Sequence, residues 1–163
     1  SSRVDEGTCV IVSLPFNIVK QAQQPAQSAA PKLKDFAGCK VLVAEDNDIN
    51  MEIISELLKM NGLEVLPAGD GKTALELFER SAVGSISMVL MDMQMPELDG
   101  CAAAKAIRAL PRADAQTVPI LALTGNADNE SIEAAMGAGM NDYMVKPIKM
   151  SLLAKKMGEY LHC

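Results

Sequence analysis

Five residues that could do chemistry together stand where short apolar runs of the chain end. They are Glu45, Asp46, Asp92, Thr124 and Lys146. Two carboxylates about 4 Å apart repel each other by roughly 4 kcal/mol at an effective dielectric near 20, so such a cluster requires a cation. Oxygen ligands with room for water suit Mg²⁺. A carboxylate can also attack a phosphoryl group, whose oxygens a lysine and a hydroxyl can bind. These residue types indicate a metal-assisted phosphoryl acceptor.

Each of these residues also has a simpler explanation. An aspartate after a strand often caps the next helix, which would account for Asp46 or Asp92 taken alone. A lysine before a proline, as at Lys146, is usually an ordinary surface residue, and Thr124 with Gly125 can form a turn. The functional interpretation therefore depends on all of these side chains meeting at one end of one sheet.

Strand-like and helix-like segments alternate from Cys39 onward, and these elements would position the five residues. The expected strands are the short runs 41–44, 63–66, 87–91, 119–123 and 141–145. The first of them, 41–44, is apolar on both faces, as a central parallel strand should be. Helices are expected over a segment that Asp48 caps and Gly62 ends, and then over 71–81, 100–110, 131–138 and 151–161. This alternation predicts an α/β fold, a doubly wound parallel sheet with helices on both faces. Pro67 places the strand 63–66 at a sheet edge.

The composition fits one domain with an extension. The chain has 163 residues, of which 49% are hydrophobic and 22% charged, as in a globular core. The net charge of −6 argues against a nucleic-acid-binding surface, which needs clustered Lys and Arg. No apolar stretch approaches the roughly 20 residues that cross a bilayer, and no signal peptide is visible. We expect a cytoplasmic fragment without membrane contact, from a parent protein that could itself be membrane-anchored.

Histidine and cysteine chemistry is largely excluded. His162 is the only histidine, which argues against His-rich metal sites and against Ser-His-Asp or Cys-His catalysis. The four cysteines are scattered without a C-x-x-C pair, and we expect reduced thiols.

The residues around the candidate site resemble the receiver domain of response regulators. The matching motifs are VLVAEDNDIN at 41–50, MVLMDMQMPELDG at 88–100, ALTGNA at 122–127 and YMVKP at 143–147. The resemblance covers about residues 39–161 and is strongest to receivers attached to hybrid sensor histidine kinases. It implies a three-layer (βα)5 sandwich whose five-stranded sheet has the order 2-1-3-4-5.

The resemblance also implies a phosphoacceptor and a metal site. Asp92 would accept the phosphoryl group. Mg²⁺ would be bound directly by Asp46 and Asp92, through water by Glu45, and by the backbone carbonyl of Gln94.

A conformational switch is implied in the same way. Thr124 and Lys146 would bind the phosphoryl group, and Thr124 and Tyr143 would move together on phosphorylation. The bond before Pro147 is expected to be cis, as in relatives.

The resemblance also implies that Gln94 and Asn126 occupy two positions that tune dephosphorylation in the family. Gly125 stands where alanine is common in the family, which we expect to loosen the switch loop without removing chemistry.

The amino-terminal segment is expected to come from another domain. EGTCVIVSLPF at 6–16 resembles the last strand of a histidine-kinase ATPase domain, although Asp5 replaces the first glycine of that motif. A chance strand is the alternative. Residues 17–38, rich in Gln, Ala and Pro, are expected to be a linker, and 39–163 the receiver domain.

Together these features predict a phosphorelay module. A phosphohistidine on the dimerisation domain of the parent kinase, or on a histidine phosphotransfer protein, would exchange its phosphoryl group with Asp92. The partner surface is expected around 47–54, where Ile49, Ile53 and Ile54 are expected to be partly exposed. His162 lacks a helical-bundle context and is rejected as the phosphodonor. The sequence is compatible with a homodimer. It does not decide whether self-catalysed phosphorylation and dephosphorylation make the fragment an enzyme.

Two other classes of function are alternatives to a phosphorelay module. Phosphatases with an aspartate nucleophile usually carry a second acid two residues further on, where this chain has Gln94. A binding-only receiver would never be phosphorylated, and the intact set of Asp92, Thr124 and Lys146 argues against it.

Overall fold

The chain divides into two units, residues 1–32 and 33–163. The structure is a computed structural model that describes residues 2–3, 7–8 and 36–161. In the first unit, β1 (Ser2–Arg3) pairs antiparallel with β2 (Gly7–Thr8). Residues 9–16 of the expected kinase strand, and most of the expected linker, lie outside the described residues. The assignment of 1–16 and 17–38 therefore stays a prediction.

A parallel sheet forms the centre of the second unit. Its strands are β3 (Lys40–Ala44), β4 (Glu64–Ala68), β5 (Met88–Asp92), β6 (Ile120–Thr124) and β7 (Asp142–Val145). They lie in the order β4-β3-β5-β6-β7, and all neighbouring pairs are parallel. Counted from β3, this is the expected order 2-1-3-4-5. Pro67 lies on β4, at the sheet edge, where a residue without an N–H is tolerated.

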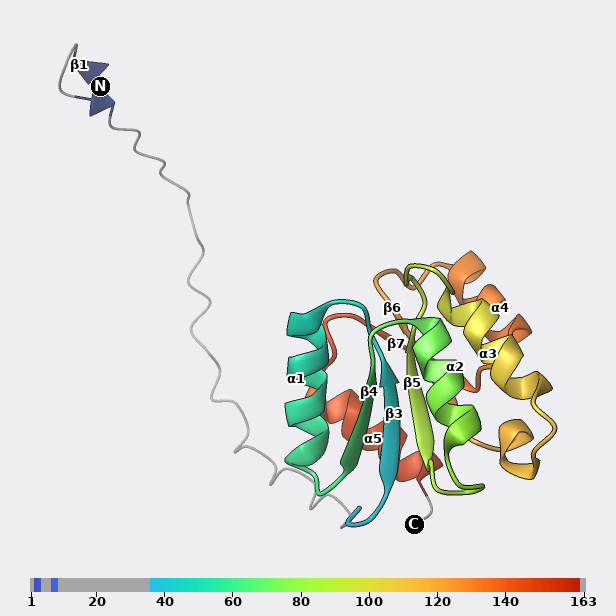
Figure 1. Cartoon of the computed structure of the whole chain (residues 1–163). Coiled ribbons are helices and arrows are strands. Elements are labelled where there is room, and N and C mark those ends of the chain that lie inside the picture. The colour runs from blue at the N-terminus through green and yellow to red at the C-terminus, as the bar shows by residue number, and fades with distance from the viewer. Residues whose placement is uncertain (1, 4–6, 9–35, 162–163) are drawn as a thin grey trace. The chain divides into compact units, whose positions relative to one another are not determined.

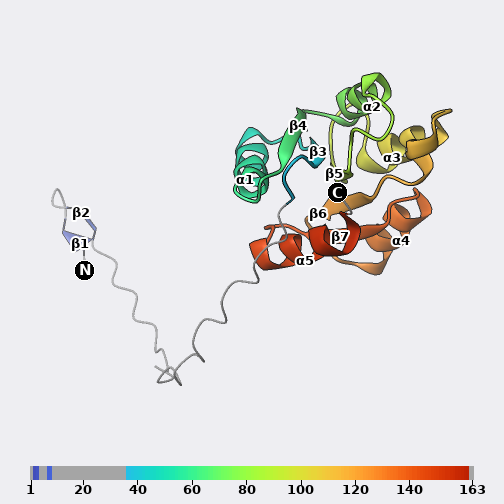
Figure 2. The same ribbon diagram turned by 90° about the horizontal axis from the view of Figure 1, so that it is seen from below.

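Helices cover both faces of this sheet (Figures 1 and 2). They are α1 (Asp48–Lys59), α2 (Gly71–Arg80), α3 (Gly100–Ala109), α4 (Asn129–Gly137), α5 (Met150–Tyr160) and the short 3-10 helix η1 (Ala113–Gln116). α1 and α5 pack on one face, and α2, α3 and α4 on the other. The expected three-layer (βα)5 sandwich is confirmed. Among the described helices, none combines the length and apolar character that a membrane span requires.

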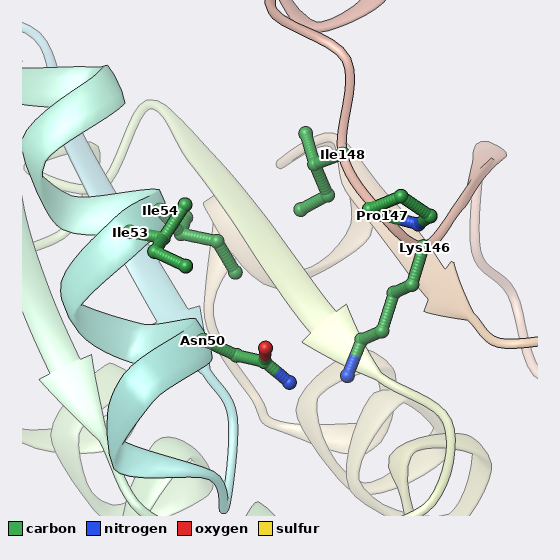
Figure 3. Close-up of a pocket in the computed structure, with 6 residues that line it drawn as sticks. All are labelled: Asn50, Ile53, Ile54, Lys146, Pro147 and Ile148. Atoms are coloured by element: carbon green, nitrogen blue, oxygen red, sulfur yellow. The ribbon is translucent and has the colours of Figure 1, made fainter. Parts of the chain in front are cut away.

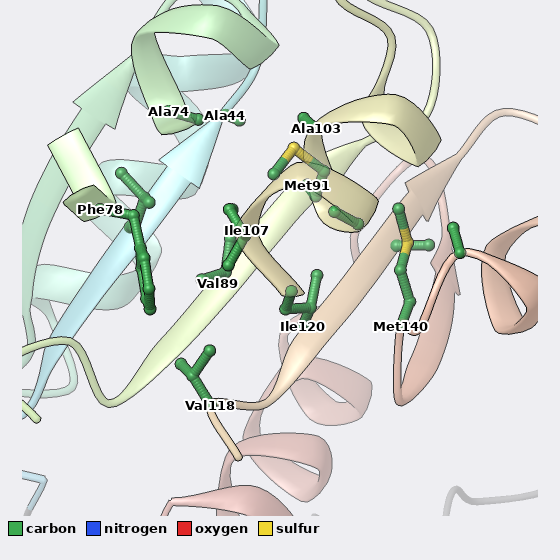
Figure 4. Close-up of a cluster of buried hydrophobic side chains, with 14 of the residues drawn as sticks. Ala44, Ala74, Phe78, Val89, Met91, Ala103, Ile107, Val118, Ile120 and Met140 are labelled. Atoms are coloured by element: carbon green, nitrogen blue, oxygen red, sulfur yellow. The ribbon is translucent and has the colours of Figure 1, made fainter. Parts of the chain in front are cut away.

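The hydrophobic core consists of two clusters, one on each side of the sheet. Val89 and Met91 of β5 belong to the cluster under α2, α3 and α4, which Figure 4 shows. Met88 and Leu90 belong to the cluster under α1 and α5, because successive strand side chains point to opposite faces. Phe36, in the stretch expected to be linker, is buried in this second cluster.

Helix α1 differs from its expected form in two ways. Its N-cap is Asn47, not Asp48: the Asn47 side chain accepts hydrogen bonds from two backbone N–H groups of the first turn. The face that packs on the sheet carries Ile54 and Leu58, so the expectation that Ile54 is partly exposed is wrong: it is 2% exposed, whereas Ile53 is 52% exposed as expected. The helix has apolar residues on more than one stripe, and only one stripe can face the sheet.

The expectation of reduced thiols is wrong for one cysteine. Cys39 is buried and disulfide-bonded, and its partner cysteine lies outside the described residues. Cys101 is a free thiol.

Candidate functional site

The carboxyl ends of four parallel strands bring the expected residues to one edge of the sheet. Glu45 follows β3, Asp92 ends β5, Thr124 ends β6 and Lys146 follows β7. The Nζ atom of Lys146 lies 2.6 Å from Asp92 Oδ2 and 2.5 Å from Glu45 Oε2. Residues up to about a hundred positions apart in sequence therefore meet because the strand register aligns their ends.

Three carboxylates form an acidic cluster at this edge. Each of Glu45, Asp46 and Asp92 offers an oxygen, and these oxygens lie within 4.8 Å of one another. Glu45 and Asp92 are buried, while Asp46 is exposed. The buried Glu45 Oε2 accepts no hydrogen bond, because its close contact with Lys146 lacks hydrogen-bond geometry. All-oxygen donors, one open side and an oxygen without a hydrogen bond fit a hard cation such as Mg²⁺.

Lys146 and Asp92 balance burial against their mutual attraction. Burial opposes the charge of Lys146, but its hydrogen bond to Asp92 and its attraction to the Glu45 carboxylate outweigh burial, so the pKa of Lys146 is raised. Burial raises the pKa of Asp92 more than the hydrogen bonds from Lys146 and the Gln94 N–H lower it. A cation near Asp92 would favour its charged form.

The backbone on either side of Asp92 is tightly packed. The Gln94 N–H donates to Asp92 Oδ1 at 3.2 Å, and the Gln94 side chain is exposed. A Cβ at Gly100, the first residue of α3, would lie 2.1 Å from the Asp92 carbonyl oxygen. The absence of a side chain at Gly100 thus lets α3 begin directly against the candidate acceptor.

The hydroxyl of Thr124 is held by the loop after β6. It donates to the Asn126 carbonyl oxygen at 2.7 Å and accepts from the Asn126 N–H at 3.2 Å. Asn126 is exposed and its side chain donates to Asp128, which caps α4. Tyr143 is half-buried and packs against the cluster under α2, α3 and α4.

An apolar groove opens beside the acidic cluster. The cavity is about 340 Å³ and lies between α1 and the segment after β7 (Figure 3). Its lining residues are Asn50, Ile53, Ile54, Lys146, Pro147 and Ile148. The bond between Lys146 and Pro147 is cis, as expected.

One polar residue that contacts the site was not predicted from the sequence. Asn50 donates from Nδ2 to Glu45 Oε1 at 2.9 Å. In the sequence, this contact is indicated by a carboxamide in the first turn of the helix that follows Glu45. The pattern is weak, because asparagine is also common in helix caps.

Residues 41–157 match the sequence pattern of the response regulator receiver domain. The chain belongs to this family. The match covers all of the sheet except Lys40 and extends into α5, so the receiver domain accounts for most of the chain.

Among the similar proteins are histidine kinases, some of them named as hybrid kinases. Hybrid signal transduction histidine kinase I of Dictyostelium discoideum is 41% identical over 116 residues, 70% of this chain and 7% of that protein. The osmosensing histidine protein kinase SLN1 of Saccharomyces cerevisiae is 38% identical over 130 residues, 78% of this chain and 10% of its own length. The chain thus spans about a tenth or less of these relatives. It carries a receiver domain of the two-component phosphorelay type found in hybrid kinases.

Solved receiver domains share the fold. The receiver domain of a sensor histidine kinase from Pseudomonas aeruginosa, solved with a magnesium ion in its active-site cleft, is 37% identical, with a TM-score of 0.69. It covers 76% of this chain and 98% of its own. The Saccharomyces cerevisiae complex of the phosphotransfer protein Ypd1 with the receiver domain of Ssk1 matches at 31% identity and a TM-score of 0.68, covering 78% of this chain and 91% of that chain.

Proposed function

We propose that this receiver domain accepts a phosphoryl group onto Asp92 from a phosphohistidine, in a Mg²⁺-dependent reaction. One observation carries the proposal. The Asp92 carboxylate lies beside the Lys146 ammonium and within 4.8 Å of carboxylate oxygens of Glu45 and Asp46. A nucleophile, a fixed positive charge and ligands for a cation are thus in one place.

The metal would be held by residues at this edge. Asp46 and Asp92 would bind it directly, Glu45 through water, and Gln94 through its backbone carbonyl. Bound there, Mg²⁺ would supply positive charge against the charge that develops on the transferring phosphoryl group.

The covalent step exchanges one bond for another. An Asp92 carboxylate oxygen attacks phosphorus, the phosphorus–nitrogen bond of the phosphohistidine breaks, and its electron pair stays with the imidazole. Before this step, in the structure, Asp92 Oδ2 contacts Lys146 and Asp92 Oδ1 accepts a hydrogen bond from the Gln94 N–H. Lys146 would move its hydrogen bond from the carboxylate to a phosphoryl oxygen and so keep the new charge paired.

The switch residues would then change partners. The Thr124 hydroxyl would leave the Asn126 carbonyl and donate to the phosphoryl group, and Tyr143 would turn inward beside it. The surface of α4, β7 and α5 would change shape as a result. Gln94 and Asn126, both exposed beside the site, would tune the rate of dephosphorylation.

The groove beside α1 would seat the phosphohistidine-bearing partner. Ile49 is 68% exposed and Ile53 is 52% exposed, so α1 presents an apolar surface next to Lys146. The fold shared with the receiver in the Ypd1 complex supports a histidine phosphotransfer protein as partner. The dimerisation domain of a parent kinase would present the same chemistry.

The amino-terminal segment would be the end of a kinase ATPase domain. Hybrid signal transduction histidine kinase L of Dictyostelium discoideum is 35% identical over 158 residues and 93% of this chain. That share is larger than the receiver domain alone, which supports a hybrid-kinase context for the residues before it.

Transfer of label tests the function. We would mix the chain with phosphorylated histidine phosphotransfer proteins and follow the label in both directions, with Asp92→Asn as the test variant. Asp70→Asn, at the cap of α2, is the matched control. Wild type and Asp70→Asn should take up label, and Asp92→Asn should take up none. Label on Asp92→Asn would exclude Asp92 as the acceptor.

A further inference from the structure

The Glu45 carboxylate is held from two sides. Its Oε1 accepts a hydrogen bond from Asn50 Nδ2 at 2.9 Å, and its Oε2 lies 2.5 Å from Lys146 Nζ. Glu45 is only 2% exposed. Water is therefore largely excluded from this carboxylate, and its orientation depends on these two neighbours.

The backbone of α1 fixes where Asn50 lies. Asn47 caps the helix, and its Oδ1 accepts from the Asn50 backbone N–H at 3.1 Å. Asn50 therefore lies in the first turn of α1, the helix that follows Glu45. Figure 3 shows the side chains of Asn50 and Lys146 converging from opposite sides of the groove.

The hydrogen-bond donor to Glu45 Oε1 is an uncharged amide, which affects the charge of the acidic cluster. The Asn50 amide satisfies one Glu45 oxygen without adding positive charge, so the negative charge of the acidic cluster is kept for a cation. Without the amide, Glu45 Oε1 would be buried without this partner, and the carboxylate would be held by Lys146 alone. Hydrogen bonds of this kind orient metal ligands in other proteins.

We propose that Asn50 is a positioning residue of the Mg²⁺ site, which fixes the orientation of the Glu45 carboxylate within the acidic cluster. This inference rests on the proposed function, since it concerns the same metal. Asn50 also lines the groove. A residue that served only the groove would affect partner binding and leave the affinity for Mg²⁺ unchanged.

Calorimetric titration of the chain with Mg²⁺ alone tests the proposal. Asn50→Ala should weaken binding by about tenfold, the lower end of the range for lost outer-shell partners. Alanine has the highest helix propensity, so α1 should remain intact, which a thermal melt checks. Asn50→Leu, nearly the same size but without a donor, should weaken binding equally. Ile53→Ala, in the same groove, should not change the affinity.

The outcomes separate this inference from the proposed function. If the wild type binds Mg²⁺ and both Asn50 variants bind it as tightly, Asn50 is not a positioning residue and the proposed function stands. If Asn50→Leu restores the affinity that Asn50→Ala loses, side-chain volume matters and the hydrogen bond does not, which also overturns the inference. If the wild type binds no Mg²⁺, the metal part of the proposed function fails together with this inference.

Discussion

Lys146 is the residue on which the electrostatics of the site depend. Its ammonium contacts both Asp92 and Glu45, and its pKa is raised by those contacts, so it stays charged at neutral pH. Removing it would leave two buried carboxylates facing each other, which is costly unless another cation takes its place. Lys146 and a bound metal therefore compete for the same negative charge.

Replacing Lys146 with methionine should have two opposite effects. Phosphorylation of Asp92 by acetyl phosphate should slow by roughly a hundredfold, because the ammonium no longer stabilises the transferring group. Mg²⁺ should bind more tightly, because its competitor is gone. Label incorporation and calorimetry measure the two effects. Lys155→Met, at an exposed lysine on α5, should change neither. Weaker Mg²⁺ binding in Lys146→Met would contradict the competition.

A second charged pair stabilises the edge of the domain near η1. Arg112 donates from Nε to Asp114 Oδ1 at 2.7 Å, and the Gly84 N–H donates to Asp114 Oδ2, also at 2.7 Å. The hydrogen bonds from Arg112, followed by that from Gly84, lower the pKa of Asp114 to about 2. The folded state thus favours the charged carboxylate.

This pKa predicts how stability depends on pH. Because the folded pKa lies below the unfolded one, the contribution of Asp114 is present above about pH 4 and is lost as pH falls through about 2. At pH 7, Asp114→Asn should lower the free energy of unfolding by at most about 2 kcal/mol, less where water screens the pair. Urea unfolding at several pH values measures this. A difference from wild type that persists unchanged at pH 2 would contradict the assignment.

At the scale of elements, the junction of β5 and α3 positions the candidate acceptor. Gly100 leaves no room for a side chain, since an added Cβ would lie 2.1 Å from the Asp92 carbonyl oxygen. The start of α3 and the end of β5 must therefore shift together if Gly100 is replaced.

Gly100→Ala should destabilise the domain by about 1–3 kcal/mol, because overpacking forces the backbone to move. It should also slow phosphorylation, since Asp92 would move with β5. The matched control is Gly125→Ala, where an added Cβ meets nothing within 4 Å. Urea unfolding of both variants measures the change. Equal stability of the two variants would show that the close approach at Gly100 does not matter.

Helix α1 carries an exposed apolar stripe beside the groove. Ile53→Glu should slow phosphotransfer from a histidine phosphotransfer protein by about tenfold or more, because a charge would be buried at the interface. Labelling by acetyl phosphate, which needs no docked protein, should be unchanged. Val83→Glu places the same charge at a residue that is 65% exposed and far from the groove in sequence, and should leave transfer unaffected. Equal effects of the two substitutions would argue against this surface.

Much of the fold could be predicted because short apolar runs and turn residues have local causes. The strand ends carrying Asp92 and Thr124 were predicted to within a residue or two, and Pro67 correctly indicated an edge strand. Which apolar residues of α1 are buried could not be predicted, because the helix has more apolar residues than one face can hold. Asn50 was missed because its partner Glu45 becomes apparent only when the first turn of α1 is placed over the end of β3.

For the whole molecule, the comparison with longer proteins is informative. The chain spans about a tenth or less of two histidine kinases that it resembles, one of them named as a hybrid kinase. The alignment with hybrid kinase L extends beyond the receiver domain. We infer that the acidic site receives a phosphoryl group from a phosphohistidine, either in another domain of such a protein or on a separate partner protein. The groove beside α1 lies next to Lys146, so docking and chemistry are adjacent.

Mass spectrometry of the chain after incubation with acetyl phosphate tests the central claim most directly. We expect the mass of one added phosphoryl group, on the peptide that contains Asp92, in the presence of Mg²⁺. The addition should be lost when Mg²⁺ is chelated and absent in Asp92→Asn. A phosphoryl group that forms equally well without Mg²⁺, or that appears on Asp92→Asn, would exclude Mg²⁺-dependent phosphorylation of Asp92.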